Sequence, residues 1–229
     1  MKNIILLFLV IVPTIINSQN FNTIVADDTS FTNKNKFLLS LGLNFFLVND
    51  NDYFTKNQNL GLNVGFGYEY KLNNIVSLVT QIELIKYLLK ANIDTSIKFP
   101  ISSYHDSYTF SLTGGSIVAG TYFNIPYKKC KTLFSLKAAG FVDLFLLKKL
   151  IVSGKISTDT SPFAQKYETT YGGLIYINSF NYGIETEIRK DFIAIGSKFY
   201  LSNFIDKKFA NKNLWPQFPN LIVYSKILF

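Results

Sequence analysis

The chain has 229 residues, a formal net charge of +8 and 48% hydrophobic residues. Its single cysteine, Cys130, excludes an intrachain disulfide, so the fold has no covalent cross-link to rely on. A basic balance can indicate nucleic acid, but the export signal described next makes phosphorylated lipid headgroups the expected anions. We therefore expect no nucleic-acid partner.

The chain begins with the features of a secretory signal peptide. Lys2 precedes an apolar run over residues 4–12, and Ser18 ends the stretch before a polar residue. An uncleaved anchor helix is the alternative, but the apolar run is shorter than the roughly 20 residues such a helix needs. We predict a signal peptide over residues 1–18, followed by a flexible lead-in over residues 19–35.

The segment from 60 to 72 alternates strictly between apolar and small or polar residues. The even positions are Leu60, Leu62, Val64, Phe66, Tyr68, Tyr70 and Leu72, and the odd ones are Gly61, Asn63, Gly65, Gly67, Glu69 and Lys71. Successive side chains of a β-strand point to opposite faces, so this pattern predicts a strand with one apolar and one polar face.

Six further segments show the same alternation, at 37–47, 76–84, 132–146, 174–188, 193–202 and 221–229. A seventh segment, at 108–124, is also predicted as a strand, although Gly114, Gly115 and Gly120 blur its phase. Short turns follow the second, fourth and sixth strands, and long loops follow the first, third, fifth and seventh. The second and third of these long loops are predicted at 88–107 and 147–170. Outer-membrane barrels alternate their connections in this way and have an even strand number. We predict one barrel domain over residues 36–229.

Two barrels share this pattern, because alternation alone does not say which face points outward. A lipocalin-like soluble barrel turns its apolar face inward around a ligand, whereas a membrane barrel turns it toward lipid. The polar faces here are rich in glycine, the apolar faces almost lack charge, and the charges on the polar faces balance. These features favour the fold class all-β, an eight-stranded antiparallel up-and-down transmembrane β-barrel.

The charged residues of the polar faces are expected to form a structural network in the lumen, because unpaired charges there would be costly. The predicted members are Glu69, Lys71, Glu83, Lys137, Asp143, Glu185, Glu187, Arg189, Lys198 and Lys226. Aromatic residues near strand ends are expected at the membrane interface, namely Tyr68, Tyr70, Tyr122, Phe134 and Phe229.

Lysines of the third and fourth long loops are interpreted mainly as solvated loop charges, with lipopolysaccharide phosphates as the alternative contact. They are Lys148, Lys149, Lys155, Lys207, Lys208 and Lys212.

The run GFGYEYKLNNIVSL at 65–78 and the terminal strand LIVYSKILF carry a resemblance to a known family. With the signal peptide and the eight-strand layout, the chain resembles the outer-membrane β-barrel proteins of Bacteroidota, the broad group that contains the PorT-like family. The C-terminal Phe229 resembles the signal read by the outer-membrane assembly machinery. The resemblance implies that the chain is located in the outer membrane. PorT itself is associated with protein secretion.

His105, the only histidine, lies beside Ser103, Asp106 and Ser107 in a predicted loop. Some eight-stranded outer-membrane barrels modify lipid A with serine and histidine, so these residues suggest an enzyme as one hypothesis. Neighbouring residues of a loop seldom converge on one point, and serine and aspartate are common in loops. We therefore expect no enzyme, cofactor or metal site.

The expected function is that of a structural or interaction barrel in the outer membrane, with long loops that contact partners or surface ligands. A secretion-accessory or narrow transport component is the alternative, and a lipid A-modifying enzyme is the third hypothesis. Expected partners are outer-membrane lipid and lipopolysaccharide, the assembly machinery, and a protein partner at the extracellular loops. Eight strands enclose a lumen that side chains largely fill, so a diffusion porin is not expected.

Overall fold

A computed structural model describes residues 35–47, 59–73, 75–91, 107–126, 133–156, 165–206 and 218–229. All of them belong to one compact unit, Asn35–Phe229. The predicted signal peptide at 1–18 and the lead-in up to residue 34 lie outside the described residues. No helix in the described ranges has the length and apolar character to cross a membrane.

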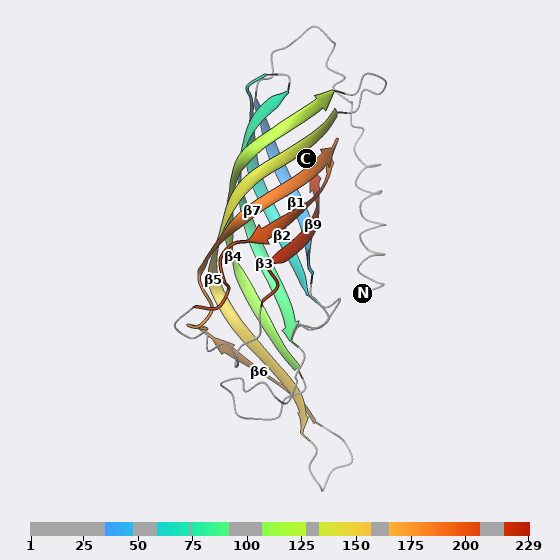
Figure 1. Cartoon of the computed structure of the whole chain (residues 1–229). Helices are drawn as coiled ribbons and strands as arrows, with labels where there is room; N and C mark the ends of the chain where they lie inside the picture. The colour runs from blue at the N-terminus through green and yellow to red at the C-terminus, as the bar shows by residue number, and fades with distance from the viewer. Residues whose placement is uncertain are drawn as a thin grey trace. The chain divides into compact units, whose positions relative to one another are not determined.

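The described residues form nine β-strands in one antiparallel sheet (Figure 1). The strands are β1 (Asn35–Phe46), β2 (Leu60–Lys71), β3 (Val76–Ala91), β4 (Ser107–Pro126), β5 (Leu133–Ile156), β6 (Gln165–Gly172), β7 (Phe180–Lys190), β8 (Ile193–Tyr200) and β9 (Leu221–Leu228).

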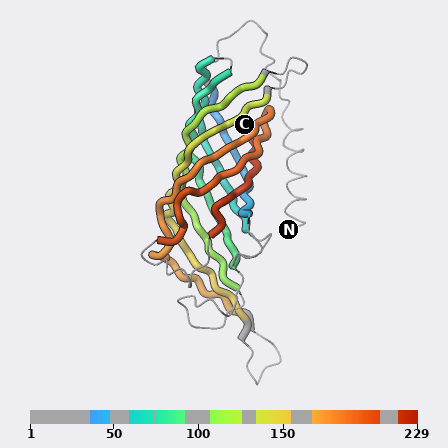
Figure 2. Tube along the Cα trace, in the orientation of Figure 1, coloured from blue at the N-terminus to red at the C-terminus, as the bar shows by residue number. Residues whose placement is uncertain are grey.

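Eight of these strands close into a ring, which confirms the predicted eight-stranded antiparallel barrel. The order runs β4-β3-β2-β1-β9-β8-β7-β5, and β4 also pairs with β5. The first and last strands meet, with Ser40 opposite Leu228 and Phe46 opposite Ile222, so blue β1 lies beside red β9 in Figure 2. Closure leaves no free edge within the ring, which satisfies the backbone hydrogen bonds of every strand.

The connections alternate in length as predicted. At one end, which we call the turn end, Asn73 makes a tight turn between β2 and β3 by accepting hydrogen bonds from the backbone N–H groups of Ile75 (2.8 Å) and Val76 (2.7 Å). Two residues join β7 to β8, and the first of them, Asp191, has a φ of 53°, as tight hairpins require. The opposite end carries the long connections, and we call it the loop end.

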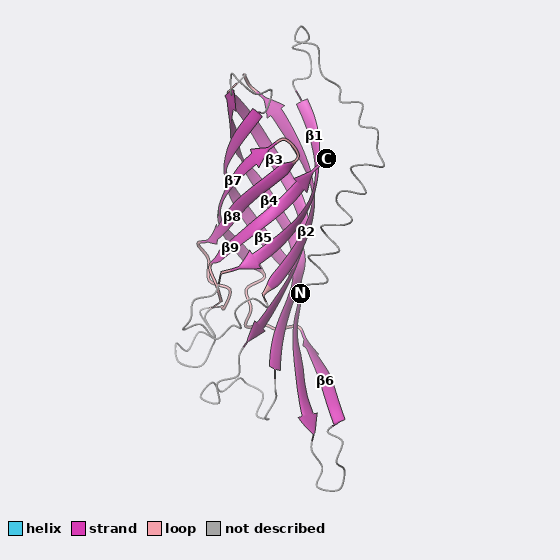
Figure 3. Ribbon diagram, turned by 90° about the vertical axis from the view of Figure 1, so that its right-hand side faces the viewer, coloured by secondary structure: helices cyan, strands magenta, loops and turns pink. Residues whose placement is uncertain are grey.

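The prediction of a third long loop over 147–170 is wrong. β5 continues to Ile156 and pairs with β6, from Lys149 opposite Gly172 to Ile156 opposite Gln165. Figure 3 shows this hairpin projecting beyond the ring. Apolar and polar residues alternate less regularly in this hairpin than in the ring strands, so the alternation pattern did not reveal it.

Two other predicted boundaries also differ. β3 runs to Ala91, beyond the predicted loop start at residue 88. Its odd positions stay buried to the end of the strand, but there they are apolar, and the outward side includes lysines. The predicted strand at 174–188 begins only at Phe180. Leu174 is buried rather than outward-facing, and a bridge between Ile177 and Ile205 holds the segment before β7 against the loop end.

A β-bulge in β5 marks the point where the ring meets its extension. Gly114 pairs with Phe145 but Thr113 pairs with Leu147, so Leu146 is an extra residue. Both Leu146 and Leu147 therefore face outward, with 70% and 56% of their surface exposed. Side chains beyond the bulge resume the alternation in the opposite phase, as a single inserted residue requires.

Candidate functional site

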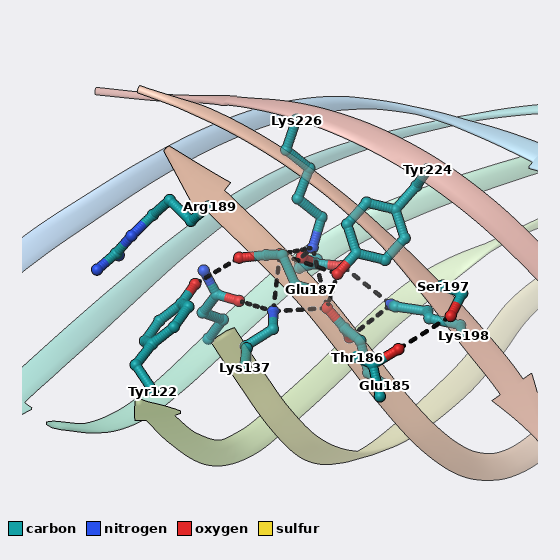
Figure 4. A network of polar contacts seen from close by, with 12 residues as sticks. Tyr122, Lys137, Glu185, Thr186, Glu187, Arg189, Ser197, Lys198, Tyr224 and Lys226 are labelled. Carbon is teal, nitrogen blue, oxygen red and sulfur yellow. Dashed lines mark hydrogen bonds and ion pairs between the residues drawn. The ribbon is translucent and has the colours of Figure 1, made fainter. Parts of the chain in front are cut away.

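The interior of the barrel toward the turn end is the one feature of the described residues where many charged side chains gather. Nine of the ten predicted members are buried there: Glu69, Glu83, Lys137, Asp143, Glu185, Glu187, Arg189, Lys198 and Lys226. They come from β2, β3, β5, β7, β8 and β9, whose odd or even positions the strand geometry turns inward. We call these nine residues the lumen network, and Figure 4 shows the part of it around Lys137, Glu185 and Lys226.

Lys71 does not belong to the lumen network, contrary to the prediction. It is the last residue of β2 and its side chain is exposed at the rim of the turn end. Its alternation phase matches that of Glu69, but a strand face is enclosed only where the neighbouring strands continue beside it. Position along the strand therefore decided its environment.

The centre of the lumen network is a cluster of three acids and three bases. Glu185 accepts a hydrogen bond from Lys137 (2.6 Å) and lies 3.4 Å from the Lys226 ammonium group. Glu187 also belongs to the cluster, with its Oε2 atom 3.0 Å from Lys137 Nζ.

Glu83 joins the same cluster from the opposite wall of the barrel. Its carboxylate binds Lys226 Nζ at 2.5 Å and Lys198 Nζ at 3.1 Å. Lys198 also donates to Ser116 Oγ at 3.3 Å. The three carboxylates and three ammonium groups thus form one neutral cluster that ties β3, β5, β7, β8 and β9 together across the lumen.

A separate ion pair lies nearer the turn end. Arg189 donates from both terminal nitrogens to Glu69, at 2.9 and 3.4 Å. Its guanidinium group also stacks on the ring of Tyr122, 4.1 Å from the ring centre. A two-point contact of this kind fixes both partners more firmly than a single hydrogen bond.

Tyr122 is itself inside the barrel, which corrects the prediction of a membrane-interface residue. It is fully buried and donates to Glu187 Oε1 at 2.6 Å. Tyr224, on β9, donates to Glu185 at 2.5 Å and to Glu187 at 2.8 Å. Tyrosines thus supply the donors that the carboxylates need beyond the lysines, a role that the alternation pattern did not distinguish from that of a lipid-facing ring.

Asp143 lies apart from the other acids. It makes no ion pair with another residue of the described ranges, and instead accepts hydrogen bonds from the hydroxyl groups of Tyr200 and Tyr87, the latter at 3.5 Å. Tyr200 also donates to Tyr87 at 3.3 Å. This group stands at the border between the lumen network and an apolar cluster toward the loop end.

The apolar cluster fills the barrel beyond Asp143. Its buried members include Ile85, Leu89, Phe110, Leu112, Phe145, Leu150, Val152, Phe204, Phe218 and Ile222. Phe204 stacks on Phe218 with ring centres 5.3 Å apart, and Phe110 meets Phe218 edge-on at 5.2 Å. The interior is thus closed by aromatic packing toward the loop end.

The centre of the lumen network has no surface exposed to the solvent outside the barrel. The side chains of Glu185, Lys137 and Lys226 are 0% exposed. A continuous water-filled passage would leave the side chains that line it partly exposed. The geometry therefore describes a filled interior, with a structural charge network rather than an open channel.

The predicted loop lysines are placed differently from each other. Lys148 is half-buried and donates to the carbonyl oxygen of Ile177 (2.6 Å) and to Ser179 Oγ (2.9 Å), so it is not a solvated loop charge. It anchors the segment before β7, in which burial raises the pKa of Tyr176 to about 12. Lys149 is exposed on the outward face of β5.

The serine–histidine hypothesis concerns residues that are mostly outside the described ranges. His105, Ser103 and Asp106 lie there, as do Cys130, Lys207, Lys208 and Lys212, and nothing is described of the Lys155 side chain. Ser107 begins β4, and its hydroxyl lies 2.6 Å from Ser153 Oγ on β5. Within the described residues, no group of three His, Cys, Asp or Glu side chains is arranged to hold a metal ion.

Comparison with known proteins leaves the structure as the basis for a functional proposal. No family model matches the sequence, and no characterised protein matches it either.

Proposed function

We propose that the chain is an outer-membrane β-barrel of the structural or interaction type, whose filled barrel anchors the long connections of its loop end at the cell surface. The observation that carries this proposal is the distribution of polarity across the wall of the barrel. Charged side chains are buried inside, while large apolar side chains are exposed outside.

The exposed apolar residues form a belt around the ring. Its members include Leu41, Phe66, Ile82, Leu84, Ile117, Leu144, Leu146, Ile184, Ile188 and Ile195, which are between 39% and 70% exposed. Soluble proteins rarely expose contiguous apolar patches larger than a few hundred Å². A lipid environment gives this belt an apolar solvent, and ring closure leaves no unpaired strand edge within it.

A lipocalin-like barrel has the reverse arrangement, with an apolar interior around a ligand and a polar exterior. The burial of Glu83, Glu185 and Lys198 inside the ring argues against that alternative. The predicted signal peptide supports export. Similarity to PorT-like barrels stays a prediction, and no contact in the described residues favours a secretion-accessory role over an interaction role.

The filled interior also supports an anchoring role over transport. The experiment is to reconstitute the refolded protein in planar bilayers and to record single-channel current, with a 16-stranded porin as the positive control. We expect no steady conductance, because side chains close the lumen. A stable open level in most insertions would contradict the interaction role and favour narrow transport.

The membrane location is tested separately by gel migration. A closed barrel in detergent should migrate differently before and after boiling and should need detergent to remain in solution. A product that stays in solution without detergent would contradict the membrane proposal.

A further inference from the structure

The outward face of the barrel changes character just beyond the apolar belt on β3, β4 and β5. Lys86 and Lys90 lie on β3 and Lys149 on β5, all on the outward face. Lys86 and Lys149 are exposed, and Lys90 is half-buried. The exposed Leu84 and Leu147 mark the border of the belt on its loop-end side, next to these lysines.

The strand register places the three lysines around one small area. Lys86 pairs with Thr113, Lys90 with Thr109, and Lys149 with Ser111. Four residues along a strand span about 13 Å, and two strand spacings span about 10 Å. The three lysines therefore flank a row of three hydroxyl-bearing residues on β4, with Lys86 and Lys90 on one side and Lys149 on the other.

The electrostatics of this area are one-sided. None of the three ammonium groups makes a hydrogen bond or ion pair with another described residue, in contrast to the buried lysines of the lumen network. The outward positions of β3, β4 and β5 carry no acidic residue in the described ranges. Lysine side chains at such a border extend their ammonium groups toward the polar layer while their stems lie on apolar surface.

A shallow groove of about 190 Å³ adjoins Lys86 on the belt side. Leu62, Val64 and Leu84 line it, together with Lys86 and Thr113. Gly115, opposite Leu84, leaves open space next to this row, since a Cβ there would have no heavy atom nearer than 3.8 Å. A mainly apolar groove thus leads from the belt to Lys86.

We propose that Lys86, Lys90 and Lys149 bind the phosphorylated headgroup of a lipid in the leaflet at the loop end, and that an acyl chain of this lipid lies in the adjoining groove. The proposal rests on the membrane location proposed above. Charge complementarity identifies the headgroup as a phosphate carrier, because three cations that have no partner in the described ranges, with nearby hydroxyls, match phosphate oxygens. Continuity with the apolar belt identifies the source as a membrane lipid.

The test uses the full mature protein in nanodiscs of phosphatidylcholine with a small fraction of phosphatidic acid, and native mass spectrometry counts the retained lipid. The variant Lys86→Gln/Lys90→Gln/Lys149→Gln is compared with a matched control, Lys36→Gln/Lys71→Gln/Lys190→Gln, which removes three charges at the turn end. We expect apparent affinity for phosphatidic acid to fall about 10- to 100-fold in the first variant and to stay near wild type in the control.

Three outcomes would overturn the lipid site. An equal fall in lipid retention in both variants would show a non-specific charge effect. Unchanged retention in the first variant would show that the lipid binds elsewhere. Displacement of the lipid by millimolar inorganic phosphate would show recognition of free phosphate. If the protein instead stays soluble without detergent, the proposed membrane function itself fails, so the two failures are distinguishable.

Discussion

The turn-end and loop-end halves of the same strands carry opposite patterns. In β3, the inward positions of the turn-end half are polar at Ser77, Gln81 and Glu83 and apolar at Val79, while the outward positions next to them are mainly apolar. Beyond residue 84 the inward side becomes Ile85, Tyr87 and Leu89, and the outward side gains lysines. β4 repeats the exchange. Its inward residues Tyr108, Phe110 and Leu112 alternate along the strand with outward residues that are all Ser or Thr.

This difference teaches that the surroundings of a strand, and not its alternation, decide which face is apolar. The turn-end half has the arrangement of a barrel in lipid, with a polar interior. The loop-end half has the arrangement of a sheet in water, with an apolar core. The exchange on β3 and β4 occurs at neighbouring positions, which marks the expected border between lipid and water.

The largest expected effect concerns the interior of the turn-end half. Glu185→Gln removes one acid from a cluster of three acids and three bases and leaves Lys137, Lys198 and Lys226 short of one negative charge. We expect the free energy of unfolding to fall by about 3–5 kcal/mol, as when a buried ion pair loses one partner. Urea titration of the refolded barrel in detergent measures it.

Lys71→Gln is the matched control, because Lys71 is exposed and outside the lumen network. Its free energy of unfolding should change by less than about 0.5 kcal/mol. Similar losses in both variants would contradict the distinction between network and rim.

The next effect concerns the outward faces of the two halves. Ile82→Arg places a charge in the apolar belt. It should make insertion and folding in lipid vesicles less favourable by about 2–4 kcal/mol. Thr109→Arg places the same charge on the outward face of the loop-end half, where the cost should be close to zero. Equal costs at the two positions would show that both faces meet the same solvent.

A smaller effect separates the crowded interior from the open exterior by means of glycine. A Cβ at Gly183 would collide with the carbonyl oxygen of Phe199 and meet the ring of Phe141, whereas one at Gly115 has open space. We expect Gly183→Ala to lower the free energy of unfolding by about 1–3 kcal/mol. Gly115→Ala should leave it nearly unchanged, and thermal denaturation of both variants in detergent compares them.

The ring could be predicted from the sequence because most of its strands alternate with period two. Inward and outward positions of β1, β2, β7 and β9 follow directly, and so do nine of the ten residues of the predicted network. Strict alternation works here because one face meets side chains and the other meets solvent along the whole strand.

The loop-end extension could not be predicted in the same way. The bulge at Leu146 shifts the phase of β5, so residues before and after it do not share one pattern. The roles of Tyr122 and Lys148 depend on partners distant in the sequence, Glu187 on β7 and Ile177 in the segment before it, which no local pattern reveals. Pairings across the lumen are a property of closure and register.

The most direct test of the account is the solvent that each half meets. In a Cys130→Ser background, spin labels at Ile82 and Thr109, both outward-facing, report collisions with oxygen, which concentrates in lipid, and with a water-soluble nickel chelate. The account predicts that the label at Ile82 meets oxygen and is shielded from nickel, and that the label at Thr109 shows the reverse. Nickel access at Ile82 equal to that at Thr109 would contradict it.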